Sequence, residues 1–202
     1  YSPKTNSWRP CTPMSQRRGD AVAGVVGGRL VVAGGVCNGE VLTSAEAYTG
    51  TGWTPLPPMP HVADMATACV LNGRLYVVGG AGSSTVQVLE ATAERGLFWS
   101  CKADLPAARD EAACVAHEGR VWVLGGCVDH RVSASVIVYG AEADAWDPDA
   151  VPALPSPCRG CQCGRCHRCG SPAAASRPRS RPLLMAVAAA AANAAAAQPL
   201  LP

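Results

Sequence analysis

The chain has 202 residues, which is enough for one medium-sized domain or for one domain followed by a tail. Apolar residues make up 49% and charged residues 16% of the sequence, so the chain can form a packed core and is not disordered over most of its length. The formal net charge of +2 gives no reason to expect nucleic acid as a partner.

Charge and cysteine content divide the chain near residue 155. Residues 1–149 contain eleven basic and all fifteen acidic residues, a net charge of −4, whereas the remainder contains six arginines and no acidic residue. Six of the 11 cysteines are scattered through the front part, and five lie between Cys158 and Cys169. The front six lack the close spacing of a small disulfide scaffold, so we expect a reducing compartment, the cytoplasm first and the nucleus second.

A repeat of about 46 residues runs through the front part. Its tryptophans are separated by 45, 46 and 47 residues, and they are Trp8, Trp53, Trp99 and Trp146. Its diglycines are separated by 45 and 46 residues, and they are Gly34-Gly35, Gly79-Gly80 and Gly125-Gly126. Each diglycine follows a Gly-Arg pair and an apolar run, so four kinds of marker keep one period.

In chain order, each unit is expected to form four short strands. The first strands are small and apolar, and they cover Ala21 to Val26, Ala66 to Leu71 and Ala112 to Ala116. Cys69 and Cys114 are expected at matching places in them, as small buried side chains and not as reactive thiols. The second strand runs from the Gly-Arg turn to the diglycine and is apolar enough to be buried on both faces.

The third strand of each unit carries Tyr48, Leu89 or Tyr139, and the fourth carries the Trp and leads into a Pro-rich link. No window shows the apolar period of about 3.6 residues that is typical of a helix, and turn residues recur every 8–12 positions, which is typical of an all-β fold.

The order Gly-Arg, apolar run, Gly-Gly, Tyr, Trp and then Pro-Met or Leu-Pro resembles the kelch motif of β-propellers. The resemblance covers roughly residues 1–155, with motifs at about 14–53, 59–99 and 105–146. It implies an all-β fold, a partial propeller of about three four-stranded blades plus a leading strand, followed by a low-complexity tail. The structural motif residues are Gly34, Gly35, Tyr48, Trp53, Gly79, Gly80, Trp99, Gly125, Gly126, Tyr139 and Trp146.

Both ends of the repeat region look incomplete. Residues Tyr1 to Trp8 resemble the closing strand of an earlier blade, and a fourth motif begins at Leu154-Pro155. Because propellers typically close with about four to eight blades, we expect the chain to be a fragment of a longer protein.

Residues 156–202 are expected to be a mostly disordered tail, Cys-rich at first and then rich in Ala, Pro and Arg. Two Cys-x-x-Cys pairs offer a less favoured zinc site made of Cys158, Cys161, Cys166 and Cys169, but the pairs lie closer together than in zinc ribbons. The stretch from Pro182 to Pro202 is uncharged but rich in alanine, which contributes little to membrane insertion compared with Leu or Ile. No membrane anchor is therefore expected. No cofactor or metal is expected.

The resemblance implies a protein-protein interaction module, and not an enzyme. It is similar to the substrate-recognition propeller of a cullin-type ubiquitin ligase adaptor, with an actin- or cytoskeleton-binding kelch protein as the alternative. A propeller oxidase is less favoured, because no Tyr/His copper-ligand set, activated nucleophile or phosphate-binding loop is visible. The identity of the protein partner does not follow from the sequence.

The loops after the diglycines differ among the three units and are expected to present the binding surface. In the third loop, His130 and Arg131 are the best single candidates for partner contact. The arginines that open two of the motifs either line the same face or pair with Asp20 and Asp110, and they are Arg17, Arg18 and Arg109.

Overall fold

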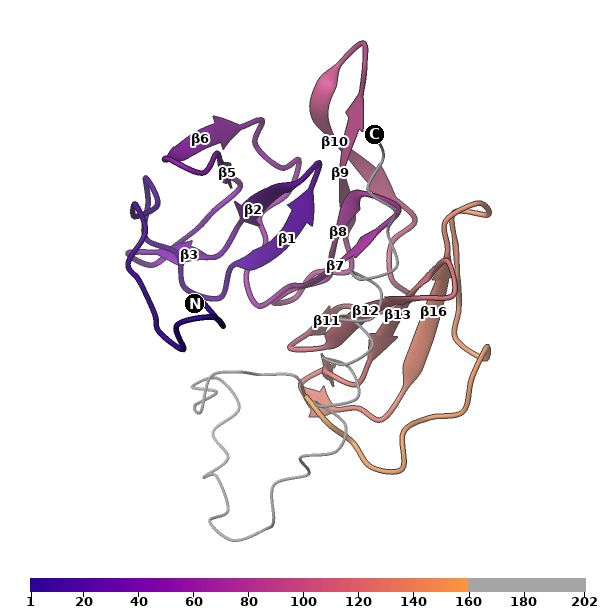
Figure 1. The fold of residues 1–202 in the computed structure, drawn as a ribbon. Coiled ribbons are helices and arrows are strands. Elements are labelled where there is room, and N and C mark those ends of the chain that lie inside the picture. The colour runs from indigo at the N-terminus through magenta and orange to yellow at the C-terminus, as the bar shows by residue number, and fades with distance from the viewer. Residues whose placement is uncertain (160–202) are drawn as a thin grey trace, which may run out of the picture.

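The computed structural model describes residues 1–159, which fold into strands, turns and loops without a helix in that range. Three four-stranded antiparallel sheets follow one another along the chain (Figure 1), and we call them blades 1, 2 and 3. The sequence-based expectation of an all-β fold with four-stranded blades is therefore confirmed.

Within each blade the strands pair in the order in which the chain makes them. Blade 1 consists of β1 (Val22–Val26), β2 (Arg29–Ala33), β5 (Ala45–Tyr48) and β6 (Trp53–Leu56). Blade 2 consists of β7 (Thr67–Leu71), β8 (Arg74–Val78), β9 (Val86–Thr92) and β10 (Gly96–Lys102). Blade 3 consists of β12 (Ala113–His117), β13 (Arg120–Leu124), β16 (Val136–Gly140) and β17 (Ala145–Asp147).

Two short hairpins lie between the second and third strands of blades 1 and 3. The first pairs β3 (Val36–Cys37) with β4 (Glu40–Val41). The second pairs β14 (Cys127–Val128) with β15 (Arg131–Val132), and β11 (Arg109–Asp110) adds a third strand to it. Blade 2 has the loop Ala81–Thr85 at this place, without strand pairing.

Packing between blades forms two hydrophobic cores. One core lies between blades 1 and 2 and contains Val31 and Ala47 from the first and Leu75 and Leu89 from the second. The other lies between blades 2 and 3, where the rings of Tyr76 and Tyr139 stand 6.0 Å apart. Each sheet thus buries its apolar side chains against the next sheet, which a lone four-stranded sheet could not do.

The tryptophans tie the outer edge of each blade to the linker that enters it. Trp53, Trp99 and Trp146 pair with the third-strand residue that the sequence had indicated, including Leu89 in blade 2. Each indole Nε1 also donates a hydrogen bond of 2.9 Å to a linker carbonyl, on Thr12, Pro57 and Ala103 respectively.

The first glycine of each diglycine makes room for the linker that opens the next unit. Gly34, Gly79 and Gly125 have φ between 63° and 66°, where a side chain is strained. A Cβ at Gly79 would lie 2.2 Å from the Arg109 carbonyl oxygen, and the same clash arises at Gly34 with Ala63 and at Gly125 with Cys158.

The segment at 154–158 therefore takes the place of the linkers that open blades 2 and 3. Leu154 N donates to the Ala134 carbonyl, as Leu105 N does to that of Ser84, and Gly126 N donates to the Cys158 carbonyl, as Gly80 N does to that of Arg109. This agrees with the motif that the sequence begins at Leu154.

Residues Tyr1 to Trp8 form a tight turn with a single bridge between Ser2 and Ser7, and not the extended closing strand expected from the sequence. The turn nevertheless repeats the outer hairpin of blade 3. The Tyr1 and Trp8 rings are 5.2 Å apart, against 5.0 Å for Tyr139 and Trp146. The Tyr1 hydroxyl donates to Asn6 as the Tyr139 hydroxyl donates to Asp144.

Among residues 1–159, no blade packs on one face of blade 1. Leu30 is 41% exposed, whereas Leu75 at the same register position of blade 2 is fully buried. Val25 beside Leu30 is 56% exposed, whereas its counterpart Val70 packs against the core between blades 1 and 2.

Register also corrects the expectation for the two first-strand cysteines. Thr67 and Ala113 are equivalent, because each pairs with the residue before a diglycine. Cys69 is thus the third residue of its strand and Cys114 the second, so they occupy different places and, by the alternation of side chains along a strand, opposite faces.

Candidate partner-binding surface

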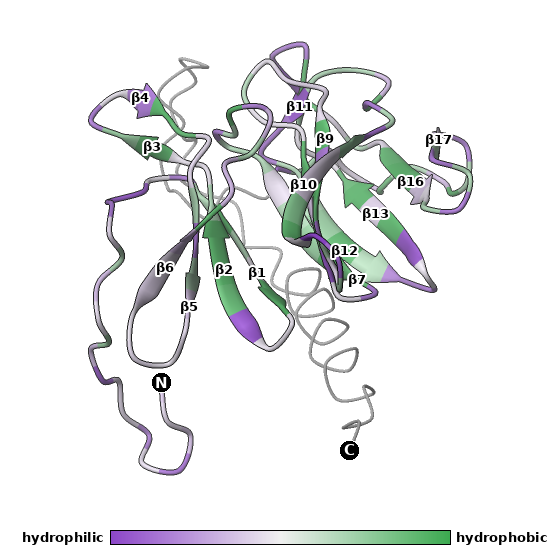
Figure 2. Ribbon diagram, turned by 90° about the horizontal axis from the view of Figure 1, so that it is seen from above, coloured by the Kyte–Doolittle hydropathy of each residue, from purple (hydrophilic) through white to green (hydrophobic). Residues whose placement is uncertain are grey.

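One end of the blades carries the two short hairpins and the linkers between blades. Figure 2 shows β3, β4 and β11 together at this end. We call it the loop end and define it as residues 36–42, 61–64, 81–85 and 127–132. The loops that differ among the units therefore do gather at one place, as a presented surface requires.

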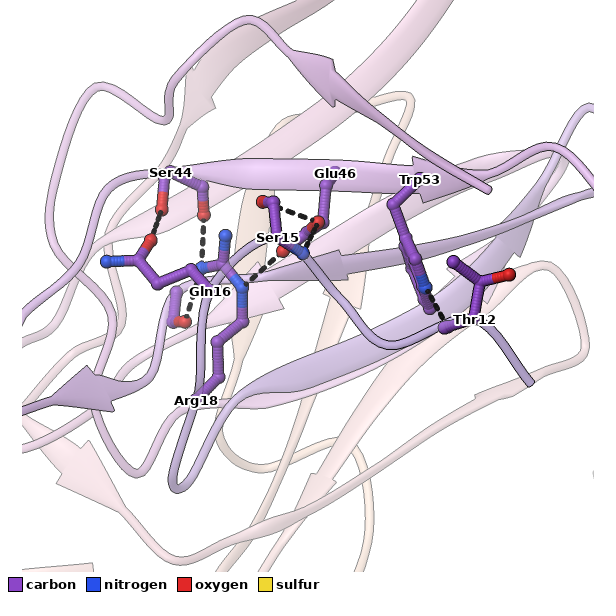
Figure 3. A network of polar contacts seen from close by, with 8 residues as sticks. Thr12, Ser15, Gln16, Arg18, Ser44, Glu46 and Trp53 are labelled. Carbon is purple, nitrogen blue, oxygen red and sulfur yellow. Dashed lines mark hydrogen bonds and ion pairs between the residues drawn. The ribbon is translucent and has the colours of Figure 1, made fainter. Parts of the chain in front are cut away.

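Arg18 lies beneath this surface, and the prediction that it contacts a partner is wrong. Its side chain is only 2% exposed, and its Nε donates to Glu46 Oε1 over 3.1 Å (Figure 3). Its Nη1 donates to the carbonyl oxygens of Gly34 and Ser44. The guanidinium thus links β2 to β5 beside the diglycine. None of these hydrogen bonds goes to Asp20.

The Glu46 carboxylate is the centre of this network. Its Oε2 accepts hydrogen bonds from the backbone N and the Oγ of Ser15, at 2.9 and 2.8 Å. Burial alone would raise the pKa of Glu46, but the bonds from Ser15 and Arg18 outweigh it and hold the pKa below its ordinary value. The pair is an internal brace that is ionised at neutral pH.

Arg109 occupies the place of Arg18 in blade 3 and is also buried, so it too is no contact residue. Its Nη1 donates to the Gly125 carbonyl and its Nη2 to Ser135 Oγ, at 2.8 Å. Ile137 stands where blade 1 has Glu46, and Nε of Arg109 has no hydrogen-bond partner among the described residues. Desolvation lowers the pKa of this guanidinium.

In blade 2 a neutral amide stands where blade 1 has the Arg18–Glu46 ion pair. Ala63 replaces the arginine, and Gln87 replaces Glu46. The Gln87 amide accepts a bond from His61 N at 2.8 Å and donates to His61 O at 3.2 Å. The linker at His61 is thereby fixed to the blade, and the His61 side chain is left exposed.

Arg17, His130 and Arg131 are exposed, in agreement with a contact role that remains a prediction. His130 lies at the tip of the β14–β15 hairpin, where it and Asp129 have φ of 63° and 49°. In blade 1 the same turn is Asn38-Gly39, a pair that suits positive φ. Histidine is strained in this conformation, and such strain is often retained where a side chain must be presented.

A depression of about 350 Å³ opens between the loop-end segments of blades 1 and 2. It is lined by Val41 on one side, His61, Val62 and Asp64 on the linker, and residues 80–83 and Thr85 on the other side. Val41 and Val62 are 40% and 50% exposed, and Val132 at the hairpin of blade 3 is 41% exposed. Exposed apolar side chains next to polar loops are typical of protein-binding surfaces.

Sequence reasoning missed the residues that shape this surface. A lone acid in the apolar run Ala45-Glu46-Ala47 was a signal that Glu46 has a buried partner. Nothing in the sequence marked Val41 or Val62, because valine is ordinary in a strand and near a proline-rich linker alike.

Residues 1–159 contain neither a metal-binding cluster nor a membrane-spanning helix. No three or more His, Cys, Asp or Glu side chains come together there in a way that could hold a metal ion. No helix in this range is long and apolar enough to cross a membrane. Of the predicted zinc ligands only Cys158 is among these residues; Cys161, Cys166 and Cys169 lie outside them, as do residues 160–202 of the tail with the Ala-rich stretch.

Comparison with known proteins agrees with this architecture. Residues 108–148 match the family model of the kelch motif, which covers blade 3 and its entering linker. No curated protein matches the sequence.

The solved structure of YjhT, a kelch propeller, is similar to this chain with a TM-score of 0.68 and 14% sequence identity. The match covers 79% of this chain and 62% of YjhT, so the chain spans less than two thirds of that protein. At this identity the likeness shows the fold alone. Residues 108–148 thus carry a kelch motif, and residues 1–159 have a propeller-like, blade-by-blade fold.

Proposed function

We propose that this chain is a protein-interaction module that binds its partner with the loop end. The proposal rests on Val41, Val62 and Val132, which are exposed at one end of the blades while the strands they adjoin bury their apolar side chains. The braces formed by Arg18, Arg109 and Gln87 support the proposal, because their hydrogen bonds fix the chain next to the two hairpins and the linker at His61 beneath that surface.

The surface suits a partner with an apolar anchor and few charges. The depression between blades 1 and 2 offers valine side chains at its rim and backbone and hydroxyl groups at Ser83 and Thr85. Asp64 lies in its lining, and the exposed Glu40, Asp129 and Arg131 add single charges of both signs elsewhere on the loop end, a pattern that orients a partner without strong electrostatic steering.

The partner class follows from the kelch resemblance. We propose substrate recognition for a cullin-type ubiquitin ligase as the first role and binding to actin as the second. Both roles are non-enzymatic and place the protein in the cytoplasm, with the nucleus as a second site for the first role.

Affinity capture with loop-end variants tests the proposal. Val62→Asp and Val41→Asp place a charge on the depression, and Val25→Asp is the matched control because Val25 is at least as exposed as either but lies on the uncovered face of blade 1. We expect at least one protein to be retained by the wild type and the control and lost at least tenfold with Val62→Asp. If every captured protein is retained equally by all variants, the loop end is not the binding surface.

The two partner classes are separated by further readouts on the same samples. Co-capture of a cullin together with the retained protein supports the adaptor role. Co-sedimentation with actin filaments that Val62→Asp abolishes supports the second role and contradicts the first.

A further inference from the structure

Two cysteines face each other between the innermost strands of blades 2 and 3. Cys69 lies on β7 opposite Tyr76 of the neighbouring strand, and Cys114 lies on β12 opposite Val123. All four side chains belong to or pack against the core that joins these two blades. The one-residue offset between the cysteines is what turns them toward each other, because an equal position in both strands would put them on the same face of their blades.

We propose that Cys69 and Cys114 are a redox-active thiol pair that closes to a disulfide across the interface between blades 2 and 3. Both thiols are free and half-buried, and both pack against the core between blades 2 and 3. A bond here would join segments that otherwise meet through side-chain packing and the linker, since β7 and β12 are in contact but belong to different sheets.

The neighbouring interface has no such pair. Gly24 and Ala68 stand in blades 1 and 2 where Cys69 and Cys114 stand in blades 2 and 3. The remaining described cysteines lie away from this core, and they are Cys11, Cys37, Cys101, Cys127 and Cys158. The thiol pair is therefore a property of one interface and not of the repeat.

Hydrogen peroxide is a sufficient oxidant for the closure. The Cys69 sulfur attacks one peroxide oxygen, the O–O bond breaks, and the sulfur becomes a sulfenic acid as the first water leaves. The Cys114 sulfur then attacks the Cys69 sulfur, the S–O bond breaks and the S–S bond forms. The Cys114 proton leaves with the hydroxyl group as the second water, so two thiols are oxidised and one peroxide is reduced.

The order of these steps follows from the surroundings of Cys114. Its contact with the Cys69 thiol and its burial raise the pKa of Cys114, so Cys69 is the thiol that peroxide oxidises first, and Cys114 gives up its proton only as it attacks the sulfenic acid. A thiol reductant would reopen the bond by exchange.

Disulfide mapping on the intact chain tests the proposal. The folded protein is treated with a small excess of hydrogen peroxide, the remaining thiols are alkylated, and tryptic peptides are sequenced by tandem mass spectrometry. Cys69 shares the peptide 30–74 with Cys37, and Cys114 lies in the peptide 110–120, so fragment ions must assign the bond. We expect a Cys69–Cys114 bond that dithiothreitol removes, and a melting temperature raised by roughly 10 °C in the oxidised form.

Three variants control the result. Cys69→Ala and Cys114→Ala should each lose the bond and the rise in melting temperature, whereas Cys101→Ala, which removes an exposed cysteine of blade 2, should keep both. Alkylation of both Cys69 and Cys114 in the peroxide-treated wild type would overturn the proposal. So would a Cys69–Cys114 bond that lowers the melting temperature, because the thiols would then not be placed for closure.

Discussion

At the scale of single residues, the three blades fill one buried position in three ways. Blade 1 uses the ion pair of Arg18 and Glu46, blade 2 the amide of Gln87, and blade 3 an arginine bonded to a carbonyl and a hydroxyl. The two arginines satisfy a carbonyl of their diglycine, and Gln87 satisfies the backbone N and O of His61 in the linker, groups that strand pairing leaves open.

Replacing Glu46 by Gln should lower the free energy of unfolding by about 3 kcal/mol at pH 7, because Arg18 would remain buried without its counter-charge. The folded-state pKa of Glu46 lies below its ordinary value of 4.5, so the stabilisation is complete above about pH 4.5 and is lost as the pH falls through the lower folded-state pKa. Urea unfolding at pH 7 and at several values below 4.5 measures this, and the difference between the wild type and E46Q should shrink in acid. Exposed Glu142→Gln should change neither quantity, and a pH-independent difference for E46Q would contradict the account.

The hairpin tip of blade 3 carries its own residue-scale prediction. His130→Gly should raise the free energy of unfolding by about 0.5–1 kcal/mol, because glycine accepts the φ of 63° without strain. The reciprocal change Gly39→His in blade 1 should lower it by a similar amount. Thermal unfolding of the two variants checks the signs, and equal signs would show that the turn conformation is not the cause.

At the scale of elements, the diglycine couples each second strand to the next linker. Gly79→Ala should cost more than about 3 kcal/mol, since its Cβ would overlap the Arg109 carbonyl, whereas Gly82→Ala should cost about 1 kcal/mol. Both glycines have φ near 66°, so the difference isolates the clash. Denaturant titration of both variants measures the two losses in free energy of unfolding. Equal losses would mean that the positive φ alone, and not the clash, explains why glycine stands at position 79.

Leu75 and Leu30 compare a covered with an uncovered blade face. Leu75→Ala should lower the free energy of unfolding by about 3 kcal/mol, because it leaves a cavity between blades 1 and 2. Leu30→Ala, at the same register position of blade 1, should lower it by less than about 1 kcal/mol. Comparable losses in urea unfolding would show that the face of blade 1 is covered in solution.

Sequence pattern predicts the elements well where one residue type has one physical role. The Trp and diglycine markers defined the units, and Leu89 was assigned to the third strand although it lies nine residues after its diglycine, whereas Tyr48 and Tyr139 lie 13 after theirs. The strand pairing puts Leu89 opposite Trp99. The pattern fails where a single-residue shift matters. Cys69 and Cys114 were expected at matching places, and only the strand pairing shows that they face each other. The Arg18–Glu46 pair joins residues 28 apart, and no local pattern reports such a contact.

At the scale of the whole molecule, three similar blades separate two tasks. The three sheets have the same strand order and pack through two hydrophobic cores, so they form a common frame. The residues of the loop end differ from one blade to the next. A frame of this kind lets the exposed residues differ without cost to packing, which is why fold and partner are decided by different residues.

Hydrogen-deuterium exchange tests the proposed binding surface most directly. It is measured on the chain alone and on the chain bound to the partner that both the wild type and the Val25→Asp control retain. Binding at the loop end should slow exchange in residues 36–42, 61–64, 81–85 and 127–132 and leave the opposite turns at 49–52, 93–95 and 141–144 unchanged. Slower exchange confined to those opposite turns would contradict it.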